Sequence, residues 1–422
     1  MRPAYKPIVF IELRNEVHFE SKIDDDPQEM WLRLVIMKAK TLNPFRFLTI
    51  TLTITLTSTM LWCQPQVLVT GLQGPQKIIV TPAGNILVSE TSLLPNSARV
   101  SLVTRGGTRS NFIENLPSGV EVTGGASGPT AMALRDRTLY LAIGGGDAER
   151  AVPDVAVTRR FNPEGISSPL FGSILECRFD RNIDTITGSF QFTPQLRQTL
   201  NDATEVDITN ASGASVRVSI LARFPMAEPA PAPLLYKFSN IWGLALSDDG
   251  RDLFVSDASN DSVSRVDTAT GRWRRITRFP AIANPTPVGP PVGDAVPTSI
   301  RTYGNQLLVS FLTGFPFAPG NARVLAINPN GTTEPFIYGL TSATDIFRRV
   351  LPDGKSQFYV LEFSANQSAA APPPGRLLRY DTAVPQVAAG GLITPVSLAY
   401  DEATKDLYIL ELRGQILRLR LD

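Results

Sequence analysis

The chain has 422 residues, of which 43% are hydrophobic and 19% are charged, so it can bury a large core and is not an intrinsically disordered protein. Basic residues number 40 and acidic residues 39, and no long run of one sign occurs, which argues against a nucleic-acid partner or a polybasic membrane-binding patch. The single histidine, His18, lies in a segment that we expect to be absent from the mature protein. A Ser-His-Asp or Cys-His centre, a histidine general base and a His-ligated zinc or iron site are therefore excluded.

The first 63 residues contain the features of a secretion signal. Residues 45–62 are apolar and rich in threonine, they follow a cluster of basic residues, and they precede Cys63. This order predicts a signal peptide over residues 37–63, with residues 1–36 as an upstream mis-start or a disordered extension. Two alternatives are an uncleaved membrane anchor, for which the apolar stretch is barely long enough, and a lipoprotein modified at Cys63, which the bulky residue before it disfavours. We expect export to the periplasm or the cell exterior, with no membrane association after cleavage.

From residue 64 onward the chain repeats one pattern. A Pro or small residue leads into a short apolar segment, a polar turn follows, and an aliphatic segment then often ends in a carboxylate. A third segment commonly contains Arg-Val. Each repeat therefore predicts a β-meander, and the repetition predicts a propeller. The copies begin near Gly74, Gly128, Ile241, Pro297, Ala343 and Pro395.

These repeats predict an all-β fold, a six-bladed β-propeller over residues 64–422. The last copy supplies only three strands, whereas residues 66–70 form a strand without a repeat of their own. We expect this N-terminal strand to close the last blade, because closure removes exposed sheet edges. The repeats are longer than ordinary blades, so we place the excess in insertions. The largest lies around residues 148–240 and includes a short helical segment over residues 193–205.

Several predicted second strands end in an acid, and their loops share a face with the loops that enter the innermost strands. Such side chains could ring the mouth of the central channel, where oxygen ligands would suit Ca²⁺. An acid in this place can also accept backbone hydrogen bonds and stabilise its own turn, and we favour that structural role. The possible ligand or metal positions are Glu90, Asp147, Asp257, Asn260, Glu362 and Glu411.

Two other segments contain residues of possible functional interest. The loop over residues 312–320 places Phe315 and Phe317 directly after a predicted second strand, where turns are usually polar. These rings are a possible ligand-contact loop, and packing over the channel mouth is the alternative. We interpret Cys177 as a packed strand residue and not as a nucleophile.

Three motifs resemble the ScyD/ScyE family, exported propeller proteins named for their association with scytonemin biosynthesis in cyanobacteria. They are Thr-Gly-Phe-Pro-Phe at residues 313–317 followed by Ala-Arg-Val, the segment 239–244, and Gly-Gly-Ala-Ser-Gly-Pro at residues 124–129. The likeness extends from about Val67 to Leu421. It implies a six-bladed fold and an exported location, and it supplies no catalytic residues. The blade pattern alone is also typical of NHL-repeat and SMP-30/gluconolactonase-like propellers.

The sequence therefore favours an exported binding or scaffold protein for a small molecule, a glycan or a protein partner, without an assigned catalytic residue. The alternative is a Ca²⁺-dependent, lactonase-like hydrolase in which Glu90, Asp257, Asn260 and Glu362 hold the metal. Ca²⁺ is the one cofactor that this sequence suggests. A quinoprotein sugar dehydrogenase is disfavoured because the usual histidine base is missing.

Overall fold

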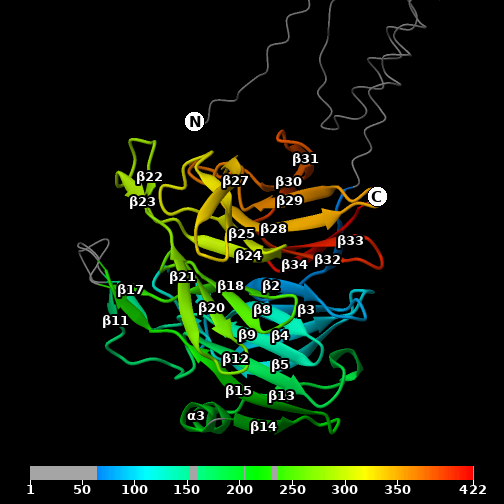
Figure 1. Ribbon diagram of the computed structural model, residues 1–422. Helices are drawn as coiled ribbons and strands as arrows, with labels where there is room; N and C mark the ends of the chain where they lie inside the picture. The colour runs from blue at the N-terminus through cyan, green and yellow to red at the C-terminus, as the bar shows by residue number, and fades with distance from the viewer. Residues whose placement is uncertain (1–63, 152–158, 204, 231–235, 422) are drawn as a thin grey trace, which may run out of the picture. The chain divides into compact units, whose positions relative to one another are not determined.

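Six antiparallel sheets form the body of the protein (Figure 1). A computed structural model describes residues 64–151, 159–203, 205–230 and 236–421, all of which belong to one unit, Trp62–Asp422. The predicted signal peptide and the residues before it lie outside the described residues. No helix in the described ranges is long and apolar enough to cross a membrane.

Each sheet is a meander whose first strand is the innermost one. The innermost strands are β2 (Pro75–Val80), β8 (Pro129–Arg135), β18 (Ile241–Leu246), β24 (Pro297–Tyr303), β28 (Ala343–Val350) and β32 (Pro395–Asp401). The second strands are β3 (Ile86–Glu90), β9 (Thr138–Ile143), β19 (Asp252–Asp257), β25 (Gln306–Phe311), β29 (Ser356–Glu362) and β33 (Asp406–Glu411). The third strands are β4 (Ala98–Val103), β12 (Ser173–Phe179), β20 (Ser262–Asp267), β26 (Ala322–Ile327), β30 (Gly375–Tyr380) and β34 (Gln415–Arg420). The fourth strands are β5 (Arg109–Leu116), β15 (Ser215–Arg223), β21 (Trp273–Arg278), β27 (Thr333–Leu340), β31 (Gln386–Leu392) and, in the last sheet, β1 (Gln66–Val69).

The sheets close into a ring, which confirms the predicted six-bladed propeller. Each innermost strand contacts the next one along the chain, and β32 contacts β2, so the last blade meets the first. The predicted closing strand is confirmed as well, because β1 pairs antiparallel with β34 and completes the last blade. The protein buries its apolar residues between neighbouring blades, in six clusters that each join residues of two adjacent sheets.

All six innermost strands contain a register irregularity at the same place, next to their second residue. In three blades this second residue is a threonine whose hydroxyl donates to the first carbonyl of the next innermost strand. Thr130 Oγ1 lies 2.6 Å from Ile241 O, and Thr298 Oγ1 lies 3.0 Å from Ala343 O. These buried bonds tie adjacent blades together near the axis, where the backbones approach one another closely. A Cβ on Gly243 would lie only 2.6 Å from the carbonyl oxygen of Thr298.

The stretch around residues 148–240 extends the first two blades. It supplies the third and fourth strands of blade 2, and β14 (Glu205–Thr209) adds a fifth strand beside β15. β13 (Phe190–Gln191) pairs parallel with β5 of blade 1. The helix expected near residues 193–205 is present as α3 (Pro194–Asp202), and Thr193 caps its N-terminus. The remaining short elements are η1 (Ile183–Thr185) and the pairs β6 (Gly119–Val120) with β7 (Ala126–Ser127), β10 (Glu149–Ala151) with β11 (Arg159–Phe161), β16 (Ala227–Pro229) with β17 (Tyr236–Phe238), and β22 (Ile282–Ala283) with β23 (Val292–Gly293).

Candidate functional site

Four of the predicted site acids lie at the face of the ring where the innermost strands begin. Glu90 pairs in register with Pro75, and Glu362 pairs with Ala343, so each acid stands opposite the first residue of its own innermost strand. Asp257 and Glu411 occupy the same place in their blades. All four side chains are buried. Because a buried carboxylate is unfavourable without hydrogen bonds, its partners indicate its role.

Each of these acids binds the chain segment that enters its own blade. Glu90 accepts from the backbone N–H of Gln73 at 2.6 Å, and Glu362 accepts from that of Thr341 at 2.6 Å. Glu411 accepts from Ile393 N at 2.6 Å, and Asp257 accepts from Asn240 N at 2.9 Å. The carboxylates therefore hold the turns that lead into the innermost strands, the structural role favoured from the sequence.

The remaining contacts of Glu90 and Glu362 do not fit a calcium site. Arg109 donates to both carboxylate oxygens of Glu90 at 2.8 and 2.9 Å, and Arg376 donates to Glu362. Guanidinium groups in these places use the oxygens that a cation would need and would also repel it. Among the described residues, no group of three or more His, Cys, Asp or Glu side chains could hold a metal ion. Calcium therefore stays a prediction that these contacts do not favour.

The other predicted site residues are spread over separate places. Asn260 donates to Asp257 through both its backbone N–H and its side-chain amide, at 3.1 and 3.0 Å. Asp147 accepts from Ser167 N at 3.0 Å, within the insertion of blade 2. The structure thus brings Asp257 and Asn260 together and leaves the other acids with partners of their own blades.

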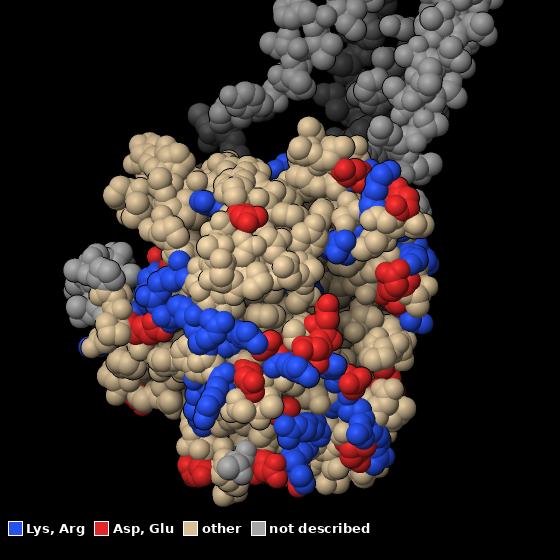
Figure 2. Space-filling view, viewed as in Figure 1, with Lys and Arg blue, Asp and Glu red and all other residues tan. Residues whose placement is uncertain are grey.

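The aromatic loop lies beside the β22–β23 hairpin. Phe315 is 55% exposed and its ring abuts Gly289 in the hairpin connection, while the ring of Phe317 lies edge-on to it, with centroids 6.3 Å apart. The surface around this hairpin carries few charges, whereas basic and acidic side chains are interspersed over the lower part of the same face (Figure 2). The loop remains a possible contact surface, and a cavity of about 440 Å³, lined in part by Ile282, Arg323 and Tyr338, borders the hairpin.

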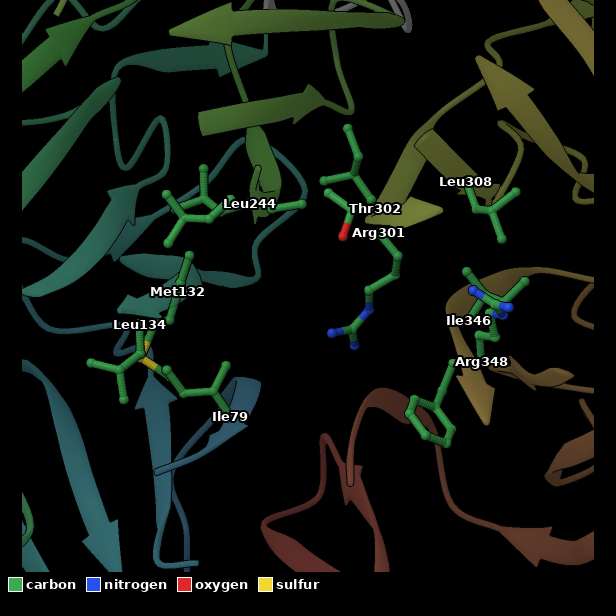
Figure 3. Close-up of a pocket in the computed structure, with 14 residues that line it drawn as sticks. Ile79, Met132, Leu134, Leu244, Arg301, Thr302, Leu308, Ile346 and Arg348 are labelled. Carbon is green, nitrogen blue, oxygen red and sulfur yellow. The ribbon is translucent and has the colours of Figure 1, made fainter. Parts of the chain in front are cut away.

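A cavity of about 300 Å³ lies among the innermost strands, away from the acids. Five of the six innermost strands line it, each through residues from the fourth position of the strand onward, whereas the acids pair with the first residues. Its volume is at the lower end of the range for small-molecule pockets. The walls are mostly aliphatic, and the side chain of Arg301 extends into the space between them (Figure 3). The lining residues are Ile79, Met132, Ala133, Leu134, Leu244, Ala245, Leu246, Ile300, Arg301, Thr302, Leu308, Ile346, Phe347 and Arg348.

A fully buried carboxylate, Asp345 of β28, anchors Arg301. The Arg301 guanidinium of β24 donates to it through Nε and Nη2, with the shortest distance 2.8 Å. The ammonium of Lys77 in β2 lies 3.3 Å from the same carboxylate. Asp345 also accepts from Leu398 N at 2.8 Å and from the hydroxyl of Ser299. One carboxylate therefore links four of the six blades across the axis.

Two basic side chains, Arg301 and Lys77, share the carboxylate of Asp345 in this cluster. Burial would raise the pKa of Asp345, but Arg301, Lys77 and the hydrogen bonds outweigh it and lower that pKa to about 2. Burial lowers the pKa of Lys77, and the nearby Arg301 lowers it further, although Asp345 opposes both. Both shifts come from burial of the cluster and from the charged groups that face one another inside it.

Sequence reasoning missed this cluster, although a signal was present. Lys77 and Asp345 each occupy the third position of an innermost strand, among residues of the first half of the strand that are buried and otherwise uncharged. Charged residues are seldom buried unless they are paired, so two charges of opposite sign at equivalent positions of two repeats indicate a contact. Arg301 lies at the fifth position of its strand and gives the same signal.

No protein-family model and no curated protein matches the chain. Among solved structures it is similar to virginiamycin B lyase from Staphylococcus aureus, at 12% identity over 83% of this chain and 96% of that one, with a TM-score of 0.42. It is also similar to a putative 6-phosphogluconolactonase from Bacteroides uniformis, at 12% identity over 81% and 79%, with a TM-score of 0.40. A third is the aldose sugar dehydrogenase from Streptomyces coelicolor in its PQQ-bound form, at 15% identity over 85% and 97%, with a TM-score of 0.30. These likenesses concern the fold alone, and the chain is a six-bladed β-propeller.

Proposed function

We propose that this protein is an exported binding propeller of the ScyD/ScyE type that holds a small organic molecule in its axial cavity. The exported location rests on the predicted signal peptide, and the family assignment rests on the sequence resemblance. The cavity supports the binding role, because it combines mostly aliphatic walls with a few polar groups, among them the oriented Arg301, the usual composition of a small-molecule site.

The residues that line the cavity are the reason why we propose binding and not catalysis. Among the described residues that line the cavity, two are arginines, one is threonine and the others are apolar. Arginine keeps its proton at neutral pH, so it orients a ligand but does not accept a proton from it. No lining side chain is a His, Cys, Asp, Glu, Lys or Tyr that could act as a general base, a general acid or an activated nucleophile.

The aliphatic wall supplies the affinity that such a site needs. A ligand that buries about 200 Å² of apolar surface gains about 5 kcal/mol from the hydrophobic effect. Association opposes this gain with the loss of translational and rotational freedom. We therefore expect weak to moderate affinity for fragment-sized compounds and tighter binding of the natural ligand.

A tryptophan at the cavity mouth tests the proposed site. Thr302 is exposed and lines the cavity, so Thr302→Trp should block it. Thr209→Trp is the matched control, because Thr209 is an exposed strand threonine in β14, on the periphery of blade 2. Saturation-transfer NMR on a library of neutral, anionic and cationic fragments should reveal binders that Thr302→Trp abolishes and Thr209→Trp leaves intact. Binding that survives Thr302→Trp unchanged, or no binder at all, would overturn the proposal.

A further inference from the structure

We infer that the ligand of the axial cavity is an organic anion, a small carboxylate with an apolar body, whose carboxylate pairs with the guanidinium of Arg301. This inference deepens the proposed function and rests on it. It identifies the chemical class of the ligand and the residue that recognises it.

The first support is the part of Arg301 that the protein leaves without a partner. Its Nε and Nη2 donate to Asp345, and Nη2 also donates to Leu398 O at 2.9 Å. Its Nη1 has no acceptor among the described residues, and the side chain is 33% exposed. One edge of the guanidinium is thus held by protein, and the Arg301 side chain extends into the space between the cavity walls (Figure 3).

The second support is the balance of charge around the cavity. Among the residues that the structure describes, Asp345 is the carboxylate that Arg301 and Lys77 share, and no Asp or Glu lines the cavity. An anion placed against Arg301 pairs with a guanidinium whose protein carboxylate is shared with Lys77, so it is attracted to the site. A cationic ligand would be repelled by the same guanidinium.

The third support is the small number of polar groups in the rest of the cavity. Arg348, the other lining arginine, donates through Nε to Ser356 at 2.9 Å and lies over the ring of Tyr303, 5.0 Å from its centroid. The aliphatic walls offer no further charged donor among the described residues. A phosphate dianion needs more donors than a carboxylate does, and a carboxylate can also place its carbon chain against the aliphatic walls. A monocarboxylate therefore matches the site better than a phosphate.

Matched pairs of acids and amides test the inference on the intact protein. The probes are acetate with acetamide, benzoate with benzamide and cinnamate with cinnamamide, titrated at low salt and followed by ligand-observed NMR. At least one carboxylate should bind about tenfold or more tightly than its amide, because a hydrogen bond to a charged partner is stronger than a neutral one. Equal or tighter binding of the amides would overturn the inference and leave the proposed function standing. Failure of all six probes, together with the fragment library, would count against both.

Substitutions at Arg301 test whether this residue recognises the negative charge of the ligand. Arg301→Gln should remove the preference for the acid, and Arg301→Lys should keep part of it because the positive charge remains. Arg265→Gln is the control, since Arg265 pairs with Asp252 on the exposed part of blade 3. A preference for the acid that persists in Arg301→Gln would overturn the assignment to Arg301. The comparison of acid with amide on the unsubstituted protein remains decisive if Arg301→Gln does not fold.

Discussion

Replacing Asp345 with Asn removes the negative charge from the axial cluster while nearly preserving its shape. Lys77 and Arg301 then lose the carboxylate that compensates both of them, and Lys77 is only 6% exposed. Removing one partner of a buried ion pair costs about 3–5 kcal/mol, since it leaves an uncompensated charge away from water. At about 2.1 cal/mol/K of unfolding entropy per residue, roughly 360 residues convert this loss into a fall of about 4–7 °C in the thermal midpoint.

The control for this variant is an Asp–Arg pair that is more exposed than Asp345 and Arg301. Asp252 and Arg265 lie 2.6 Å apart on blade 3, where the arginine is 44% exposed. Asp252→Asn should cost less than about 1 kcal/mol, because solvent screens the pair. Thermal and urea unfolding of both variants measures the difference. If Asp345→Asn melts within about a degree of Asp252→Asn, the axial cluster does not stabilise the ring as argued.

The pH dependence of stability gives the same experiment a second readout. The pKa of Asp345 is about 2 in the folded protein against an ordinary value of 3.8. A depressed carboxyl pKa contributes stability that is complete above about pH 4 and is lost as the pH falls through 2, about 2 kcal/mol in all. The stability gap between the unsubstituted protein and Asp345→Asn should therefore narrow from pH 4 to pH 2. A gap that stays constant over this range would contradict the assigned pKa.

Three further substitutions and treatments test other parts of the structure. Gly243→Ala should destabilise the fold by about 1–3 kcal/mol because its Cβ would strike the neighbouring blade, whereas at Gly390 the nearest atom is 3.9 Å from the new Cβ, so Gly390→Ala should have little effect in urea unfolding. Glu362→Gln should lower the thermal midpoint by the same amount in calcium and in EDTA, because Glu362 bonds its own blade. If calcium raises the thermal midpoint of the unsubstituted protein but not that of Glu362→Gln, the metal-site alternative is supported. Burial raises the pKa of Cys177 to about 12. A thiol reagent at pH 8, applied to the Cys63→Ser variant, should therefore label Cys177 in the unfolded chain and not in the native one. Rapid labelling of the native protein would show that the strand is accessible.

The repeat pattern determined the architecture because its signals are local. A Pro or small residue, an apolar run and a turn define each meander within a few residues, and the number of copies sets the number of blades. The missing fourth strand of the last repeat and the spare strand at residues 66–70 were likewise sufficient to predict the closing pair. The acids at the ends of the second strands were also visible in the pattern, and their structural role follows from contacts with the adjoining turn.

Only the closed ring decided the position and chemistry of the cavity. Lys77 and Asp345 are 268 residues apart in the chain, and Arg301 lies 44 residues before Asp345, so no local pattern joins them. In blade 2, the second strand ends at Ile143 and the third begins only at Ser173. The repeat pattern therefore did not predict the outer strands of this blade. Sequence periodicity determines which side chains of a strand point toward the axis. Which of these side chains contact one another depends on the order in which the six blades are arranged around the axis.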